Sequence, residues 1–167
     1  AVAEREVERL ISENANVMAQ LNNQKAETDS HNLAAGIAID KVFTKHGIKH
    51  AVSFHRSIKK AEHFTKQQTA FSKSLGNSGN IENRNVSSKL STGQRTQVLK
   101  DFIKDEKSLI TNARCLTEGV DIPAIDCVAF VDPKQSVVDI VQAAGRAMRQ
   151  SKQTGKTHGY ILLPVIV

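Results

Sequence analysis

The amino-acid sequence predicts an α/β domain whose mainly parallel sheet is covered by helices on both faces. Short apolar runs alternate with longer segments of helical periodicity, which is the pattern of repeated strand–helix units. These runs are apolar throughout, as expected for strands that are buried on both faces. The chain has 167 residues, of which 40% are hydrophobic, so it is long enough to form one domain with a substantial core.

The first half of the chain is expected to begin with polar helical sequence and then to alternate between helix and strand. In chain order the expected elements are a helix within 1–30 followed by a linker, a helix over 31–47, a strand at 50–54, a helix over 56–71 and a loop over 72–83. Gly47 suits the end of the second helix, because glycine adopts the left-handed conformation that often follows a helix. The helix over 56–71 has one apolar side, made of Ile58, Ala61, Phe64 and Phe71.

The second half continues the alternation. The expected elements are a strand within 85–91, a helix over 92–106, strands at 108–112 and 126–132, a helix over 136–148 and a last strand from 159. Ser91 or Thr92 is the expected cap of the helix over 92–106. Its buried side is predicted to consist of Val98, Leu99, Phe102 and Ile103.

Composition excludes several function classes. The net charge is +6, which permits nucleic-acid binding without establishing it. Aromatic residues make up only 4%, so base stacking on an aromatic platform is not the expected binding mode. No apolar run approaches the length of a membrane helix, no secretory leader is expected, and Cys115 and Cys127 belong to no metal-spaced cluster. These features predict a cytoplasmic protein without a membrane partner, and the chain reads as a piece of a longer one.

Two short motifs imitate parts of a nucleotide site, and their context excludes both. The stretch "TGKT" (154–157) ends like a phosphate-binding loop, but Gln150 occupies the position where that loop needs its first glycine. The stretch "DEK" (105–107) resembles an acidic metal-binding box. It closes a predicted helix, whereas such a box follows a buried strand.

The stretch "ITNARCLTEGVDIPAIDCVAFVD" places a loop between two apolar strands. Loops at the carboxyl ends of parallel strands are where open α/β sheets bind ligands. Gly119 permits close approach of a ligand to the backbone, and Asp121 can accept hydrogen bonds from a ribose. A tight turn with Asp121 as a local turn-former explains the same residues, and spacing alone leaves both readings open.

The stretch "VVDIVQAAGRAMRQ" (137–150) carries two arginines on one helix face. Arg146 and Arg149 are three residues apart, so they point the same way. Gly145 has no side chain, so another molecule can approach the helix closely beside them. Two guanidinium groups with nothing bulky between them suit a polyphosphate. A solvated basic helix end is the alternative, and the pairing with glycine favours the functional interpretation.

Four segments in order resemble the conserved motifs of superfamily 2 helicases and translocases. "TEGVDIP" and "QAAGRAMR" resemble motifs V and VI, "HAVSFHRS" resembles motif IV, and "STGQRTQVLKDF" resembles the segment that places an arginine early in the next helix. The resemblance covers 49–167 and implies a C-terminal RecA-like domain over 47–167, with 1–46 as a helical lead-in or linker. Within the family it is most similar to the helicase parts of bacterial restriction-modification polypeptides.

The resemblance also implies roles for individual residues. Arg146 and Arg149 match the catalytic arginines that approach the γ-phosphate of ATP. The nucleotide-binding positions match Gly119, Asp121 and Gln142, and the nucleic-acid contacts match Ser57 and Arg95. One position departs from the pattern: Ala113 stands where relatives often have a threonine, and Thr111 is out of register.

The expected function is therefore that of a domain in an ATP-dependent helicase or translocase. ATP and Mg²⁺ are expected to be held mainly by an N-terminal RecA-like domain of the same polypeptide, and DNA is the expected substrate, with RNA as the alternative. The isolated fragment is expected to be inactive as an ATPase. A non-catalytic RecA-like module that only binds nucleic acid or protein is the alternative function.

Overall fold

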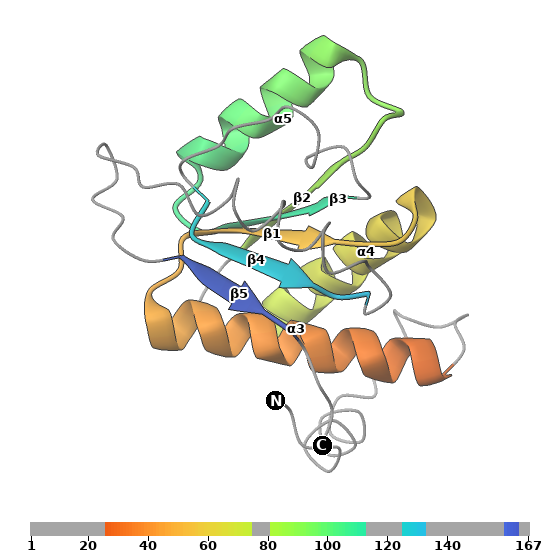
Figure 1. The fold of residues 1–167 in the computed structure, drawn as a ribbon, viewed down its shortest axis with the longest axis vertical. Coiled ribbons are helices and arrows are strands. Elements are labelled where there is room, and N and C mark those ends of the chain that lie inside the picture. The colour runs from red at the N-terminus through yellow and green to blue at the C-terminus, as the bar shows by residue number, and fades with distance from the viewer. Residues whose placement is uncertain (1–25, 75–80, 113–124, 133–158, 164–167) are drawn as a thin grey trace.

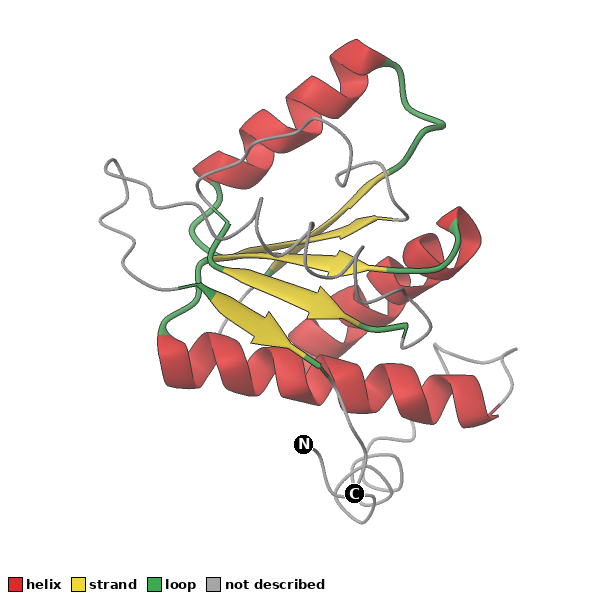
Figure 2. Ribbon diagram, in the orientation of Figure 1, coloured by secondary structure: helices red, strands yellow, loops and turns green. Residues whose placement is uncertain are grey.

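A five-stranded sheet forms the centre of the computed structural model (Figure 1). The structure describes residues 26–74, 81–112, 125–132 and 159–163. In chain order the strands are β1 (His50–Phe54), β2 (Glu82–Val86), β3 (Ser108–Asn112), β4 (Cys127–Phe130) and β5 (Tyr160–Leu162). They lie in the order β2-β3-β1-β4-β5, and every neighbouring pair is parallel (Figure 2). The predicted α/β fold with a parallel sheet is confirmed.

Helices cover both faces of the sheet, as predicted. The helices α3 (Ala26–His46) and α4 (Ile58–Ser74) lie on one face, and α5 (Thr92–Lys104) lies on the other (Figure 1). The chain moves outward from β1 to β2 through α4 and returns to β3 through α5. Because crossovers between parallel strands are right-handed, connections that run in opposite directions place their helices on opposite faces.

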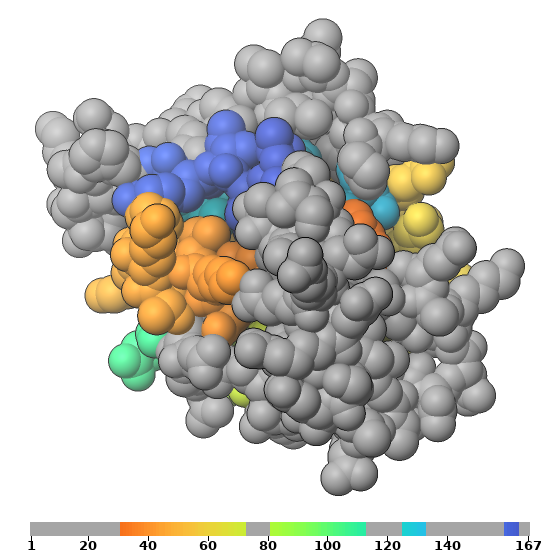
Figure 3. Space-filling model, turned by 90° about the horizontal axis from the view of Figure 1, so that it is seen from below, coloured from red at the N-terminus to blue at the C-terminus, as the bar shows by residue number. Residues whose placement is uncertain are grey.

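The sheet separates two apolar cores, because side chains alternate between its faces along each strand. The core next to α5 consists of Val52, Phe54, Val86, Phe102, Ile110, Ile125, Val128 and Phe130. The core next to α3 and α4 consists of Ala35, Ile39, Phe43, Ile48, Ala51, Phe64, Ile81, Leu109, Cys127, Ala129 and Val131. Part of the segment predicted as a lead-in, α3, thus shares a core with the strands. Figure 3 shows β5 beside α3, where the rings of Tyr160 and His46 lie 4.6 Å apart.

Several predicted elements are confirmed in detail. The strands at 50–54 and 108–112 have the predicted bounds. The helix over 31–47 is present within α3 and ends as predicted before Gly47, whose φ of 61° is left-handed, but α3 begins at Ala26, so residues 26–30 are helical where a linker was expected before 31. Ser91 is the cap of α5. Phe54 is buried and stacks on Phe130, with ring centroids 5.4 Å apart, as expected for a core residue.

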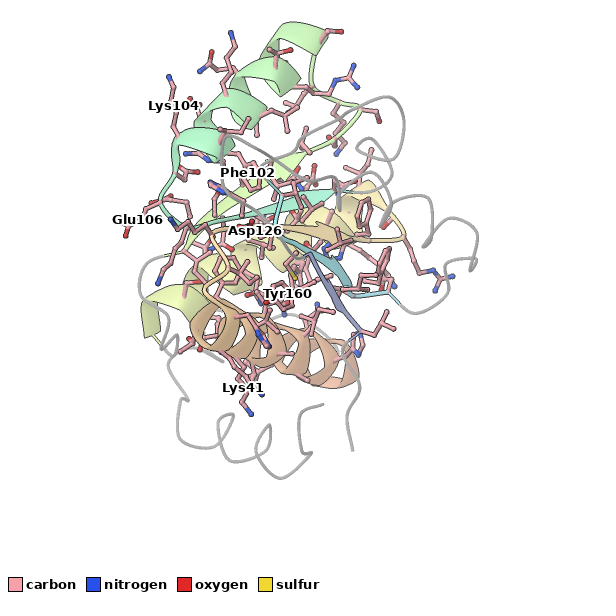
Figure 4. All side chains as sticks on the ribbon, turned by 60° about the vertical axis from the view of Figure 1, so that its left-hand side comes forward. Lys41, Phe102, Lys104, Glu106, Asp126 and Tyr160 are labelled. Atoms are coloured by element: carbon pink, nitrogen blue, oxygen red, sulfur yellow. The ribbon has the colours of Figure 1, made fainter. Side chains whose placement is uncertain are left out.

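Two predictions about β2 and α5 are wrong. The strand expected within 85–91 is Glu82–Val86, so part of the predicted loop is strand. β2 is an edge strand, and its polar side chains have partners: Arg84 pairs with Asp105, and Asn85 donates to Thr111. Ile103, which the sequence places on the buried side of α5, is 48% exposed. Phe102 lies between α5 and the sheet instead, and Lys104 points away from the sheet (Figure 4).

None of the helices in the described part of the chain is both long enough and apolar enough to span a membrane. The acidic stretch 105–107 lies between α5 and β3, as its context predicted. Asp105 accepts two hydrogen bonds from the Arg84 guanidinium, at 2.7 and 2.8 Å. These hydrogen bonds lower the pKa of Asp105 and raise that of Arg84, so this carboxylate is part of a structural ion pair.

Candidate functional site

The carboxyl ends of the parallel strands form one edge of the sheet, which we call the carboxyl edge. β1 lies between β3 and β4, and the connection that leaves β1 runs in the opposite direction across the sheet to the connection from β3 to β4. In open α/β sheets, ligands bind outside the carboxyl ends of the strands at such a reversal. Ser57 follows β1 at this edge, and Arg95 lies in the first turn of the helix that follows β2. The two predicted nucleic-acid contacts are therefore on the same edge.

Ser57 caps α4 while keeping a donor available. Its Oγ accepts the backbone N–H of Lys60 at 3.2 Å, and its carbonyl accepts that of Ala61 at 3.0 Å. The residue is exposed. A serine hydroxyl has one hydrogen to donate besides its acceptor lone pairs. The cap uses an acceptor, so the hydroxyl hydrogen can still reach a phosphate oxygen.

Arg95 lies on a rigid helix start. Ser91 and Gln94 form a capping box, in which the side chain of each accepts the backbone N–H of the other. The Arg95 backbone N–H then donates to the Ser91 carbonyl at 2.9 Å, in the first full turn. Arg95 is half-buried, and its guanidinium has no ion-pair partner among the described residues. A half-buried arginine that has no ion-pair partner among the described residues suits an external anion.

The carboxyl edge is basic. Its cationic side chains are Arg56, Lys59, Lys60, Lys89 and Arg95. In the described residues, Lys60 pairs with Asp132 at 3.8 Å and Lys89 pairs with Glu62 at 3.0 Å. The first turn of α4 contains two lysines and no acid, although the helix dipole favours acids there. Lysines that oppose the helix dipole in this way are expected where function needs a positive charge.

Buried polar side chains form hydrogen bonds at the carboxyl ends of β1 and β3. His55 is 2% exposed, its Nε2 hydrogen-bonds with the Ser53 hydroxyl at 2.9 Å, and its ring lies against Phe64. Burial lowers the pKa of His55 from 6.5 to about 4, because desolvation disfavours the imidazolium. The ring is therefore neutral at pH 7 and serves as packing. Asn112, the last residue of β3, donates its side-chain N–H to the Ser53 carbonyl at 3.0 Å.

Thr111 is unsuited to replace the threonine that relatives have at the position of Ala113. The Thr111 side chain is fully buried on the face of α4, where its hydroxyl hydrogen-bonds with that of Thr65. The Thr111 Oγ1 also accepts the Asn85 side-chain N–H at 3.0 Å. Because this hydroxyl is used inside the fold, Thr111 is a link between α4, β2 and β3.

The predicted nucleotide-site residues lie outside the described residues. These are Gly119, Asp121, Gln142, Arg146 and Arg149. The segments that contain them, 113–124 and 133–158, directly follow Asn112 and Asp132, and both of these residues are at the carboxyl edge. The "TGKT" stretch and Cys115 also lie outside the described part.

Asp132 is a residue of this edge that sequence reasoning missed. It is 8% exposed, and its Oδ2 accepts the backbone N–H of Arg56 at 2.7 Å. The available signal was a lone aspartate after the apolar run "CVAFV". Within the described part of the chain, no group of three or more His, Cys, Asp and Glu side chains could hold a metal ion.

Comparison with known proteins gives a consistent match. Residues 35–151, more than half of the chain, match the family described as the helicase conserved C-terminal domain. The chain is 35% identical over 74 residues to the ATP-dependent RNA helicase DDX51 of Danio rerio, covering 44% of this chain and 11% of that protein. It is 36% identical over 81 residues to the probable helicase A859L of African swine fever virus, covering 46% of this chain and 9% of that protein. The matches thus span about a tenth of these relatives.

Solved structures share the fold. The ATP-dependent Type ISP restriction-modification enzyme LlaBIII bound to DNA superposes with a TM-score of 0.67 at 29% identity, over 83% of this chain and 10% of that one. Domain 2 of the DEAD-box helicase Mss116p bound to an RNA duplex superposes with a TM-score of 0.59 at 20% identity, over 83% of this chain and 51% of that one. The second likeness shows the fold alone. The predicted RecA-like fold and the resemblance to superfamily 2 helicases are confirmed, and the chain belongs to the family of helicase conserved C-terminal domains.

Proposed function

We propose that this chain is the C-terminal RecA-like domain of an ATP-dependent helicase or translocase, and that its carboxyl edge faces both nucleic acid and nucleotide. The observation that carries the proposal is the convergence of Ser57, Arg95 and the starts of both motif-bearing segments on that single edge. The family match over residues 35–151 supports the same assignment. The parent polypeptide converts ATP hydrolysis into movement along a strand.

Ser57 and Arg95 form part of the nucleic-acid track. Both can contact phosphate oxygens, Ser57 through its hydroxyl hydrogen and Arg95 through its guanidinium, which has no ion-pair partner among the described residues. Phosphate contacts position a strand without reading its sequence. DNA is the proposed strand, in keeping with the DNA-bound LlaBIII structure, and RNA is the alternative that the RNA-bound Mss116p domain supports.

The nucleotide side of the edge belongs to residues beyond the described ones. Gly119, Asp121 and Gln142 line the nucleotide, and Arg146 and Arg149 stabilise the charge that develops on the γ-phosphate during transfer. An N-terminal RecA-like domain of the same polypeptide grips the ATP phosphates and Mg²⁺. Residues 47–167 constitute the domain and residues 1–46 lead into it from that neighbour, in a cytoplasmic protein.

Single substitutions in the full-length polypeptide test the assignment. Arg146→Ala or Arg149→Ala is expected to lower kcat for ATP by roughly 10³-fold or more, while the Kd for ATP changes little. This pattern is expected because the contact strengthens in the transition state. Lys104→Ala, which removes an exposed cation at the opposite edge, serves as the control and should retain wild-type turnover.

The same assay distinguishes the alternative function. Wild-type turnover in both arginine variants would remove these residues from the catalytic site. If the full-length wild-type polypeptide hydrolyses no ATP with or without nucleic acid, the domain is a non-catalytic binding module. The isolated 167-residue chain is expected to show no ATP hydrolysis above background, because we assign the phosphate-gripping half of the site to the N-terminal domain.

A further inference from the structure

The connection from β1 to α4 consists of His55, Arg56 and Ser57. The backbone N–H groups of its first two residues are fixed by hydrogen bonds at the ends of the neighbouring strands. The His55 N–H donates to the Asn112 carbonyl at the end of β3, at 2.9 Å. The Arg56 N–H donates to Asp132 Oδ2, just beyond β4, at 2.7 Å. Ser57 follows directly, so its position is set from both sides of β1.

The two groups that accept these N–H hydrogen bonds, which we call anchors, differ in whether a substitution can remove them. The Asn112 anchor is a backbone carbonyl and cannot be removed by substitution. The Asp132 anchor is a side chain, nearly buried at 8% exposure, and its other oxygen lies 3.8 Å from the Lys60 ammonium. A short hydrogen bond to a buried carboxylate is among the stronger kinds, whereas the long contact to half-exposed Lys60 contributes little. The main partner of Asp132 is therefore the Arg56 backbone.

We propose that Asp132 is a positioning residue for the nucleic-acid track: its carboxylate holds the His55–Arg56 part of this connection so that Ser57 and the first turn of α4 face the strand. The proposal rests on the proposed function. It also gives Asp132 a place between two sites, because the segment that carries Arg146 and Arg149 begins at the next residue.

The charge of Asp132 and its hydrogen bond to the Arg56 N–H have opposite effects on strand binding when Asp132 is replaced. If Asp132 acted only through its charge, removing the charge would strengthen binding, because a carboxylate near the track repels phosphates. If it acts as a tether, Asp132→Ala weakens binding, because the Arg56 N–H loses its acceptor and the connection relaxes. Asp132→Asn keeps an oxygen that can accept this N–H, so it should bind at least as tightly as the wild type.

Asp126 provides a matched control at the opposite end of β1. Its Oδ2 accepts the backbone N–H groups of Lys49 and His50, at 3.1 and 3.2 Å. Asp126→Ala thus also removes a carboxylate that caps the backbone beside β1, but at the amino edge of the sheet (Figure 4). A general loss of stability affects both variants, whereas a loss of positioning affects only Asp132→Ala.

The experiment uses the full-length polypeptide and a fluorescein-labelled single-stranded DNA oligonucleotide of mixed sequence. The Kd of Asp132→Ala is expected to rise about tenfold, which corresponds to one lost hydrogen bond to a charged group. Asp126→Ala should stay within about twofold of the wild type, and thermal unfolding should report the stability of each variant. The DNA concentration that half-maximally stimulates ATP turnover should rise in parallel with Kd in Asp132→Ala.

The outcomes separate the inference from the proposed function. Binding by Asp132→Ala that is as tight as the wild type or tighter overturns the positioning role, as does equal weakening by Asp126→Ala. Weak binding by Asp132→Asn, at the level of Asp132→Ala, also overturns it, because the tether is retained in that variant. If Arg95→Ala leaves DNA affinity unchanged in the same assay, the proposed track itself is wrong.

Discussion

Ser91 and Gln94 cap each other's backbone at the start of α5: Ser91 Oγ accepts the Gln94 N–H at 3.2 Å, and Gln94 Oε1 accepts the Ser91 N–H at 2.9 Å. Arg95 is the next residue, so its backbone is fixed by this pair before any ligand is present. A helix start whose backbone is already ordered loses less conformational entropy when its arginine binds a phosphate. The capping box is therefore part of the proposed track as well as of the fold.

Arg95→Ala is expected to weaken strand binding in a manner that does not depend on sequence. Each phosphate contact on a single strand contributes roughly 0.7 to the slope of log K against log salt concentration. The variant should lower affinity about equally for two unrelated oligonucleotides and flatten the slope by about one contact. A salt titration of both oligonucleotides measures both quantities.

Lys104→Ala is the matched control for that titration. It removes one positive charge from the same helix, but at its other end, where Lys104 points away from the sheet (Figure 4). Affinity and slope should remain those of the wild type. Sequence-selective binding by the wild type, or equal effects of the two substitutions, would mean that the basic charge of α5 is an ordinary solvated surface.

The buried neutral His55 predicts a specific pH dependence of stability. Its pKa is lowered to about 4 in the folded state from 6.5, so the unfolded chain binds one more proton between these values. Stability from this residue is fully present above pH 6.5 and decreases as the pH falls towards 4, by about 3 kcal/mol in total. His55→Gln should flatten the free energy of unfolding in this window, as measured by denaturant titration at several pH values.

The contribution of Asp105 lies in a different pH window. The pKa of Asp105 is lowered below 3.8 by hydrogen bonds from Arg84, so its stabilisation is lost only as the pH falls below that value.

For His55→Gln, an unchanged slope of unfolding free energy against pH between pH 6.5 and 4 would show that the imidazole is not the group that titrates there.

Gly36 on α3 permits close approach of α4. A Cβ at this position would lie 2.3 Å from Gln68 Nε2, and Gln68 is 3% exposed, so it has little room to move. Gly36→Ala should therefore lower the free energy of unfolding by about 1 kcal/mol, although alanine favours helix. In a Gln68→Ala background the same change should raise it by about 1 kcal/mol, because the space is then open. Equal effects in both backgrounds would contradict the contact.

Phe102 and Ile103 are neighbours on α5 with opposite environments. Phe102 is fully buried against the sheet and lies edge-on to His50, with ring centroids 5.1 Å apart. Phe102→Ala should cost about 3–5 kcal/mol of unfolding free energy, and Ile103→Ala less than about 1 kcal/mol. Chemical denaturation compares the two variants. A large effect of Ile103→Ala would indicate that this face is covered in solution.

The sequence by itself determined the elements whose pattern follows from burial. β1 and β3 are apolar runs because central strands are covered on both faces, and their bounds were predictable for that reason. The motif order also indicated the helicase family, which the family match over residues 35–151 confirms. The capping role of Ser91 could also be predicted from the local sequence, because a capping residue forms its hydrogen bonds within one helical turn.

Only the tertiary structure decided the features that depend on distant partners. β2 is polar, and it is a strand because Asp105 and Thr111, which are remote in the sequence, satisfy Arg84 and Asn85. Ile103 has helical spacing compatible with burial, but the width of the α5 contact leaves it outside. Asp132 and Arg56 are 76 residues apart, and no local pattern connects them. Strand order brings them together, because parallel pairing places the end of β4 beside the end of β1.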